Sequence, residues 1–294
     1  MIKTTVHRVL VPVTLDDQGK SAIRRALQIH EKFQTNITFL YVVPDESVIT
    51  DWFRPVKKQS NLREHRRQFK AFVTDEFDGK FPSFVRLKVR AGSITKCVVR
   101  LLNHIRYDLV ILNKKLEQSP KSESTWTNGI KLIVGEALCP VLTYDGDEKP
   151  FDFKTIMFPV DIFQPHKHKL AWAVRLAKVF NAKVHVVSAL KANLDEEESR
   201  ISKKMKYIRF TLEEAGISTV STLLREDSGK QLCDLIPEFI DETNPDLTLI
   251  MTHQENIFDF NYIGRLASEV LLKTKAPVFS ITPKKETIVA TLRQ

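Results

Sequence analysis

The chain has 294 residues, of which 43% are hydrophobic and 28% are charged, without an apolar run long enough to cross a membrane. This composition excludes wholesale disorder and a membrane span, and the length favours two domains. The formal net charge of +9 falls mostly on residues 1–147, which carry +8, whereas residues 148–294 carry +1. A basic first half suits an acidic partner, although net charge argues about association and not about fold.

The three cysteines, Cys97, Cys139 and Cys233, are odd in number and far apart in the sequence. They form no Cys-x-x-Cys pair, which argues against a disulfide framework or a structural zinc site. Residues 1–7 lack the apolar core of a secretory signal. We therefore expect a reduced, cytoplasmic protein.

Short apolar segments alternate with helical patterns through the first half. In chain order, strands are expected at residues 8–14, 36–43, 84–89, 109–112 and 140–144. Helices are expected at residues 16–33, 61–77, 93–105 and 130–137, with irregular connections at 44–60 and 114–127. Ser93 is the expected cap of the third helix. Because a helix separates successive strands, the strands are predicted to be parallel.

The second half repeats this order. Strands are expected at residues 155–160, 183–190, 218–224, 247–251 and 277–281. Helices are expected at residues 166–180, 196–215, 229–243 and 262–275. The repeat predicts domains at 1–147 and 152–294, joined by a linker at 145–152. Five strands and four helices, twice over, indicate an α/β protein with two tandem doubly wound, Rossmann-like parallel sheets.

Several segments of both halves resemble the universal stress protein family. Residues 156–161 read Ile-Met-Phe-Pro-Val-Asp and look like the first strand of such a domain. The later landmarks of the second half are residues 245–251, 264–272 and 276–278. The first half matches the same landmarks at residues 9–14, 36–44, 108–112 and 139–141. The resemblance implies two adenine-nucleotide α-hydrolase-like domains that associate across their final strands into a pseudo-symmetric pair.

In the nucleotide-binding branch of that family, an acid ending the first strand contacts adenine or ribose. A Gly-x2-Gly-x9-Gly-Ser/Thr pattern after the fourth strand holds the phosphates. Glycine permits the close approach of phosphate to backbone N–H groups at a helix start. The second half keeps Asp161 and Gly264 but has Met251, Gln254 and Arg265 at the other motif positions. Its site is therefore predicted to be partial.

The first half departs further from the pattern. Thr14 stands where the acid would be, and Asn113, Thr127 and Asn128 fall at motif positions. Gly129 would restore one glycine if the loop shifted by two residues. We therefore expect a degenerate site in this half.

The resemblance implies an adenine nucleotide, ATP or AMP, as the ligand of the second half. The residues expected to contact it are Pro159, Val160, Asp161, Ala189, Thr252, His253, Gly264, Arg265 and Leu266. Two structural interpretations compete with this one. Asp161 could instead cap the turn that follows it, and Gly264 could be a helix start packed against the sheet.

Two further patterns invite functional hypotheses. His166 and His168 beside Asp161 suggest a metal site, but solvated imidazoles at a polar helix start are the preferred interpretation, and no metal is expected. A basic run from Arg54 to Lys70 follows Trp52 and could engage phosphate backbones or acidic lipids. The outer face of a helix explains it better, so a nucleic-acid partner is not expected.

No catalytic motif is present: Gly-x-Ser-x-Gly, a Walker lysine motif and His-Glu-x-x-His are all missing from the sequence. We therefore assign no catalytic residue and expect no enzyme. The leading hypothesis is a universal stress protein-type regulatory or binding module. The alternative is a scaffold of the same fold that binds an unknown protein partner and no nucleotide. The resemblance implies an intramolecular domain pair, and a homodimer stays open.

Overall fold

The computed structural model describes residues 4–43, 55–116, 123–146, 150–161, 166–191, 195–226, 232–252 and 264–282. The chain divides into two compact units. The N-terminal unit contains Thr5–Ile133 and Asp145–Pro150. The C-terminal unit contains Met1–Thr4, Val134–Tyr144 and Phe151–Gln294.

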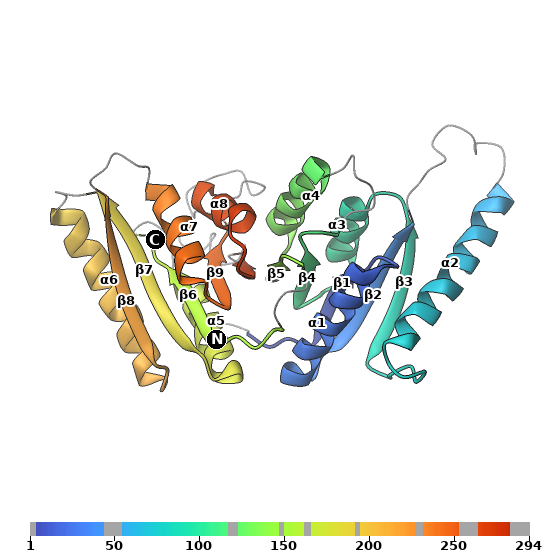
Figure 1. Cartoon of the computed structure of the whole chain (residues 1–294), viewed down its shortest axis with the longest axis horizontal. Helices are drawn as coiled ribbons and strands as arrows, with labels where there is room; N and C mark the ends of the chain where they lie inside the picture. Colours follow the sequence, from blue (N-terminus) through green and yellow to red (C-terminus); the bar gives the residue numbers. More distant parts are fainter. Residues whose placement is uncertain are drawn as a thin grey trace. The chain divides into compact units, whose positions relative to one another are not determined.

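The N-terminal unit is built on a parallel sheet with the strand order β3-β2-β1-β4. Its strands are β1 (Arg8–Pro12), β2 (Asn36–Val43), β3 (Val85–Ala91) and β4 (Leu109–Asn113). Its helices are α1 (Asp17–Phe33), α2 (Pro55–Asp75), α3 (Ile94–His104) and most of α4 (Glu123–Glu136). In Figure 1, α2 lies along the edge strand β3, which it contacts.

The C-terminal unit contains the second repeat and the last strand of the first, β5 (Val141–Tyr144). Its other strands are β6 (Thr155–Pro159), β7 (Lys183–Lys191), β8 (Thr219–Glu226), β9 (Leu247–Met251) and β10 (Val278–Ile281). Its helices are α5 (Lys167–Phe180), α6 (Asp195–Glu214), α7 (Leu232–Thr243) and α8 (Arg265–Lys273). The strand order is β5-β10-β9-β6-β7-β8, with parallel pairs except β5 and β10, which are antiparallel.

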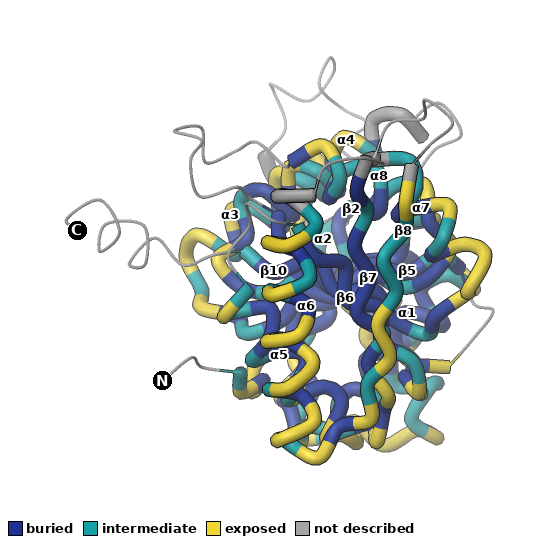
Figure 2. Tube along the Cα trace, turned by 90° about the vertical axis from the view of Figure 1, so that its left-hand side faces the viewer, coloured by how far each residue is buried: buried dark blue, intermediate teal, exposed yellow. Residues whose placement is uncertain are grey.

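Strand burial explains why these segments form the centre of each unit. Every residue of β4 and β9 is buried, and so are the last four residues of β1 and of β6. Strands covered on both faces by helices read as continuous apolar runs, which is what the sequence shows. Figure 2 shows most of β6 and β7 in dark blue, whereas α6 alternates between buried and exposed residues. The predicted α/β fold with two tandem Rossmann-like repeats is confirmed.

The first helix of each repeat occupies the same place. Pro12 and Pro159 end the first strands, Phe33 and Phe180 end the first helices, and both pairs differ by 147 in number. The next residues, Gln34 and Asn181, are both left-handed, with φ of 53° and 51°. No insertion therefore separates first strand from first helix, and each residue there has a direct counterpart.

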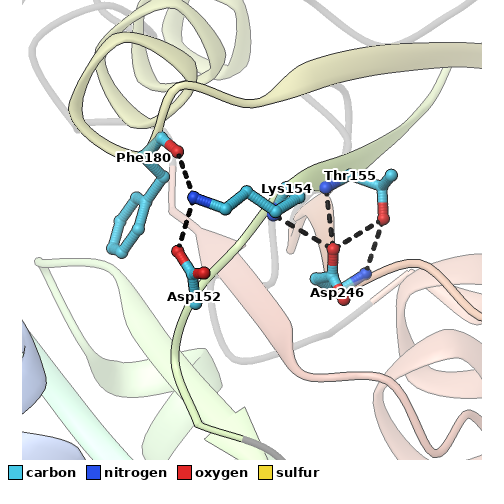
Figure 3. A network of polar contacts seen from close by, with 5 residues as sticks. All are labelled: Asp152, Lys154, Thr155, Phe180 and Asp246. Atoms are coloured by element: carbon cyan, nitrogen blue, oxygen red, sulfur yellow. Dashed lines mark hydrogen bonds and ion pairs between the residues drawn. The ribbon is translucent and has the colours of Figure 1, made fainter.

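An aspartate before the fourth strand holds the start of the first strand in each repeat. Asp246 Oδ2 accepts hydrogen bonds from the N–H groups of Lys154 (3.0 Å) and Thr155 (2.8 Å) and from the Thr155 hydroxyl (2.9 Å) (Figure 3). Asp108 Oδ2 accepts corresponding bonds from the N–H groups of His7 and Arg8, both 3.1 Å. These contacts lie at the amino ends of the strands, opposite the edge where ligands bind in this class of sheet.

Two predicted connections were wrong in part. Residues 55–60 belong to α2, because Pro55 occupies the first turn, where proline costs no hydrogen bond. Residues 123–127 belong to α4, whose polar start is anchored by the buried Trp126.

Ser93 does precede α3, but its side chain makes no capping hydrogen bond. Among the described helices, none combines the length and apolarity needed to cross a bilayer.

Candidate functional site

The carboxyl ends of β6 and β9 form the topological switch point of the C-terminal unit. The chain leaves β6 for β7 on one side, whereas β9 lies on the other. Ligands of doubly wound sheets bind in the crevice outside such a point. Ile156 pairs with Leu247, so continuing the register by five residues brings Asp161 level with Thr252. The predicted acid therefore stands at the expected place in the fold.

Strand β7 completes the line on the other side of β6. Pro159 pairs with Val187, and continuing by two residues brings Asp161 level with Ala189. The Val160 N–H donates to the Val187 carbonyl at 2.7 Å, which extends the ladder past the end of β6. Asp161 and Ala189 are both half-buried. Three of the predicted contacts thus share one level across three strand ends.

Side chains bind three successive carbonyl groups at the end of β6. The ammonium group of Lys169 donates to the Pro159 carbonyl, and Ser188 Oγ donates to the Val160 carbonyl at 2.7 Å. Lys204 Nζ donates to the Asp161 carbonyl at 2.5 Å. The donors come from α5, β7 and α6, so three elements fix the position of Asp161.

Lys169 was not predicted as a site residue. It is 4% exposed, and its Nζ lies 4.6 Å from the centroid of the Phe158 ring. Burial and the nearby charge of Lys204 lower the pKa of Lys169 to about 7, although Asp161 acts in the opposite direction. A sequence signal did exist, since residue 169 shares the buried face of α5 with Ala173, Leu176 and Phe180. The counterpart in the first repeat is Ala22.

His166 also belongs to this group of side chains. It is half-buried, which corrects the prediction of a solvated imidazole, and its ring meets the Tyr207 ring edge-on at 5.4 Å. Burial and the neighbouring Lys204, Lys169 and Lys167 lower its pKa. Among the described residues, no three His, Cys, Asp or Glu side chains are grouped as a metal ion would require.

The β9 side of the switch point presents the predicted phosphate end. Thr252 is fully buried, and its hydroxyl lies 3.2 Å from the Thr282 hydroxyl and 3.4 Å from the Ile281 carbonyl. The Gly264 N–H donates to the Thr252 carbonyl at 3.0 Å, which brings the start of α8 to the end of β9. Arg265 is exposed.

The remaining predicted residues have mixed positions. Leu266 is half-buried in the first turn of α8, and Met251 is buried at the end of β9. His253 and Gln254 lie outside the described residues. The structure therefore brings together the base end of the predicted site and the helix that would face phosphates.

At the switch point of the N-terminal unit, the side chains bond to one another and to the backbone. Asn113 Nδ2 donates to Gln18 Oε1 at 2.7 Å, and Asn113 Oδ1 accepts the Lys115 N–H at 2.9 Å. The indole N–H of Trp126 donates to the Asn113 carbonyl at 3.2 Å. Thr14 donates to Asp16 Oδ1 at 2.5 Å, and Asp16 caps α1.

The proposed motif residues of the first half are not at a helix start. Thr127, Asn128 and Gly129 lie inside α4, where the backbone N–H groups serve the helix itself and are not those of a helix start. Gly129 has a packing role instead, since a Cβ there would lie 2.3 Å from Thr95 Oγ1.

A doubly wound parallel unit repeated in tandem, with an acid at one switch point, defines the class of protein: a tandem Rossmann-like protein. The profile of the universal stress protein family matches residues 5–123 and 152–281, and the chain belongs to this family.

Solved structures with the same fold cover nearly the whole chain. A universal stress protein from Archaeoglobus fulgidus is 13% identical, with a TM-score of 0.68. The match covers 97% of this chain and 100% of that one. The functionally unknown protein PA1789 from Pseudomonas aeruginosa is 18% identical, with a TM-score of 0.63. The match covers 98% of this chain and 95% of that one. No curated protein matches the sequence significantly.

Proposed function

We propose that this universal stress protein is a cytoplasmic stress-response binding module that holds an adenine nucleotide at the switch point of its C-terminal unit. The observation that carries the proposal is the placement of Asp161. It lies level with Ala189 and Thr252 at the carboxyl ends of three adjacent strands. Cys97 and Cys139 are buried and form no disulfide, which fits a reducing compartment.

Each part of the candidate site has a role in this proposal. The carboxylate of Asp161 accepts hydrogen bonds from ribose hydroxyls or from the adenine amino group. The N-terminus of α8, after Gly264, offers N–H groups and a positive dipole end to the phosphates. Arg265, exposed beside that helix start, adds a positive charge. Binding, rather than turnover, is the proposed activity.

The two units differ in their suitability for a ligand. In the N-terminal unit, Thr14 replaces the acid and bonds to Asp16, while Asn113 is tied to Gln18 and the Lys115 backbone. A nucleotide there would have to break these contacts without gaining a carboxylate. The proposal therefore assigns one site per chain, in the C-terminal unit.

Equilibrium dialysis of the full chain with labelled ATP and AMP tests the proposal. Saturable binding at one nucleotide per chain is expected. Asp161→Ala should weaken it by about tenfold or more, because a hydrogen bond to a charged group contributes roughly 1.5–3 kcal/mol. Asp152→Ala, which removes an exposed carboxylate of the same unit, is the matched control. Absence of binding at millimolar nucleotide, or equal affinity in the Asp161 variant, would contradict the proposal.

A protein-interaction scaffold is the second candidate, and one surface favours it. Tyr207 and Phe210 on α6 are 53% and 59% exposed, next to the exposed Lys203 and Lys206. Exposed aromatic side chains are enriched where proteins bind one another. If the folded protein binds no nucleotide in the dialysis experiment, protein binding through this surface becomes the better supported function.

A further inference from the structure

Basic residues occupy every second position of β3, the end strand of its sheet (Figure 1). Arg86 and Arg90 are exposed and Lys88 is half-buried, whereas Val85 and Val89 are buried. Alternate residues of a strand point to opposite faces of the sheet, so the three basic side chains share one face. We call Arg86, Lys88 and Arg90 the basic row.

The basic row lies on the face of the sheet opposite α2. The ring of Tyr41, on β2, points to α2, where its centroid lies 5.4 Å from that of the Phe69 ring. Tyr41 pairs with Val89 in the register of β2 and β3, so Val89 faces α2 as well. The basic row takes the alternate positions of β3 and therefore points away from α2.

The charges of the basic row are not balanced by the part of the chain that the structure describes. None of its three side chains forms an ion pair with a carboxylate there. Arg90 Nη1 does donate to the Val89 carbonyl at 2.9 Å, but a carbonyl oxygen carries a partial charge only. Successive members of the row are separated by roughly 7 Å along the strand. Like charges repel one another, so negative charge laid along the row would relieve this repulsion.

A guanidinium group of α3 lies near the Arg90 end of the row. The Cys97 thiol donates to the Ala91 carbonyl at 3.8 Å, which brings α3 to the end of β3. Burial raises the pKa of Cys97, and the neighbouring charges of Arg100 and Arg90 act against this rise. Arg100 is exposed and has no carboxylate partner among the described residues. The positive surface therefore continues from β3 onto α3.

The second repeat carries no charge at the corresponding positions. Ile37 and Val184 are equivalent, since their numbers differ by 147, and they pair with Val85 and Thr219. The counterparts of the basic row on β8 are therefore Val220, Thr222 and Leu224. The same place in the same fold accepts uncharged side chains, so the fold alone does not explain the three cations.

We propose that the basic row binds an acidic peptide segment of a protein partner, which lies in extended form along β3. Every second side chain of an extended chain points to the same side, so acids at alternate positions recur with the spacing of the row. Each acid then faces one cation, and arginine forms charge-assisted hydrogen bonds with carboxylates. The proposal does not depend on nucleotide binding, which is assigned to the other unit.

Fluorescence anisotropy of the full chain with a labelled peptide of alternating glutamate and threonine tests this surface. Saturable binding is expected, and added sodium chloride should weaken it because salt screens surface charges. A triple variant gives β3 the residues of the second repeat and should bind at least tenfold more weakly: Arg86→Val, Lys88→Thr and Arg90→Leu. Glutamine at all three positions keeps long polar side chains and should cause a similar loss. Unchanged affinity in the glutamine variant would overturn the proposal.

The matched control removes three exposed charges from α2, on the opposite face of the sheet. It combines Arg63→Gln, Arg66→Gln and Lys70→Gln. This variant should change the peptide affinity less than threefold. A loss equal to that of the β3 variants would show general charge attraction and overturn the assignment to the basic row.

Two further probes test the class of partner. A peptide of the same composition, with pairs of glutamates separated by pairs of threonines, presents fewer acids to each side and should bind severalfold more weakly. Equal affinity for both peptides would overturn the extended alignment. Single-stranded DNA should bind the full chain more weakly than the alternating peptide. Tighter DNA binding that is lost in the β3 variants would assign the row to nucleic acid and overturn the proposal.

Discussion

The ammonium nitrogen of Lys169 lies 4.6 Å from the centroid of the Phe158 ring. The ring face attracts the cation and offsets part of the cost of removing it from water. Burial nevertheless dominates and lowers the pKa of Lys169 to about 7, with a further contribution from Lys204. This lysine therefore changes its charge in the neutral range.

Lys169→Met should abolish a pH dependence of stability. The unfolded chain keeps the ordinary lysine pKa of 10.5, whereas the folded pKa is about 7. Between these values the unfolded state binds a proton that the folded state lacks, so stability rises with pH by about 1.4 kcal/mol per pH unit. In urea unfolding at pH 7.5, 8.5 and 9.5, the free energy of unfolding of the wild type should rise relative to that of the variant with this slope.

The exposed Lys178, on the same helix, provides the control for this slope. Lys178→Met should unfold in parallel with the wild type at all three pH values. A constant difference between the wild type and Lys169→Met across this range would show that Lys169 stays protonated in the folded protein.

Removing Asp246 should cost more than removing its counterpart Asp108. Asp246 accepts part-buried bonds of 2.8 and 2.9 Å from Thr155, whereas the bonds that Asp108 accepts from the N–H groups of His7 and Arg8 are 3.1 Å long and exposed. Asp246→Ala should lower the free energy of unfolding by about 2–3 kcal/mol, and Asp108→Ala by about 1 kcal/mol. Urea unfolding measures both, and the reverse order would contradict the role given to burial.

The strands could be predicted because each buried strand is a continuous run of apolar residues in the sequence. In β6, continuous apolar residues ending at Pro159 specify a strand covered on both faces, and Asp161 then falls at its carboxyl end. The starts of α2 and α4 could not be predicted. The mostly polar residues after Pro55 and Glu123 do not show the helical spacing of apolar side chains. Helices of this kind depend on tertiary contacts such as that of Trp126.

The proximity of Lys169 and Lys204 at the end of β6 could be recognised only from the structure. The inward position of Lys169 can be derived from the helical period of α5, but its meeting with Lys204 cannot. Those two lysines are 35 positions apart and become neighbours only because α5 and α6 pack against the same end of the sheet. Sequence spacing carries no information about that contact.

Gly19→Ala should destabilise the protein strongly. A Cβ on Gly19 would lie 1.8 Å from the Thr14 carbonyl oxygen, a backbone atom that cannot move without shifting the turn into α1. We expect a loss of about 3 kcal/mol, reduced by the better helix propensity of alanine.

Gly129→Ala is the matched comparison for this substitution. Its Cβ would meet the Thr95 hydroxyl at 2.3 Å, but that group can rotate away. The gain in helix propensity then offsets most of the cost, and a change within about 1 kcal/mol is expected. Thermal unfolding of both variants tests the distinction, which fails if the two shifts are equal.

Asn113 should stabilise the N-terminal unit without contributing to nucleotide binding. Its side chain is 1% exposed and bonds both Gln18 and the Lys115 backbone. Asn113→Ala leaves the Lys115 N–H without this acceptor and should cost about 2 kcal/mol of unfolding free energy. Asn103→Ala, at an exposed position on α3, should stay within about 0.5 kcal/mol. Because the proposed ligand occupies the other unit, dialysis should give the same nucleotide affinity for Asn113→Ala as for the wild type, and a tenfold loss would place a site at Asn113 instead.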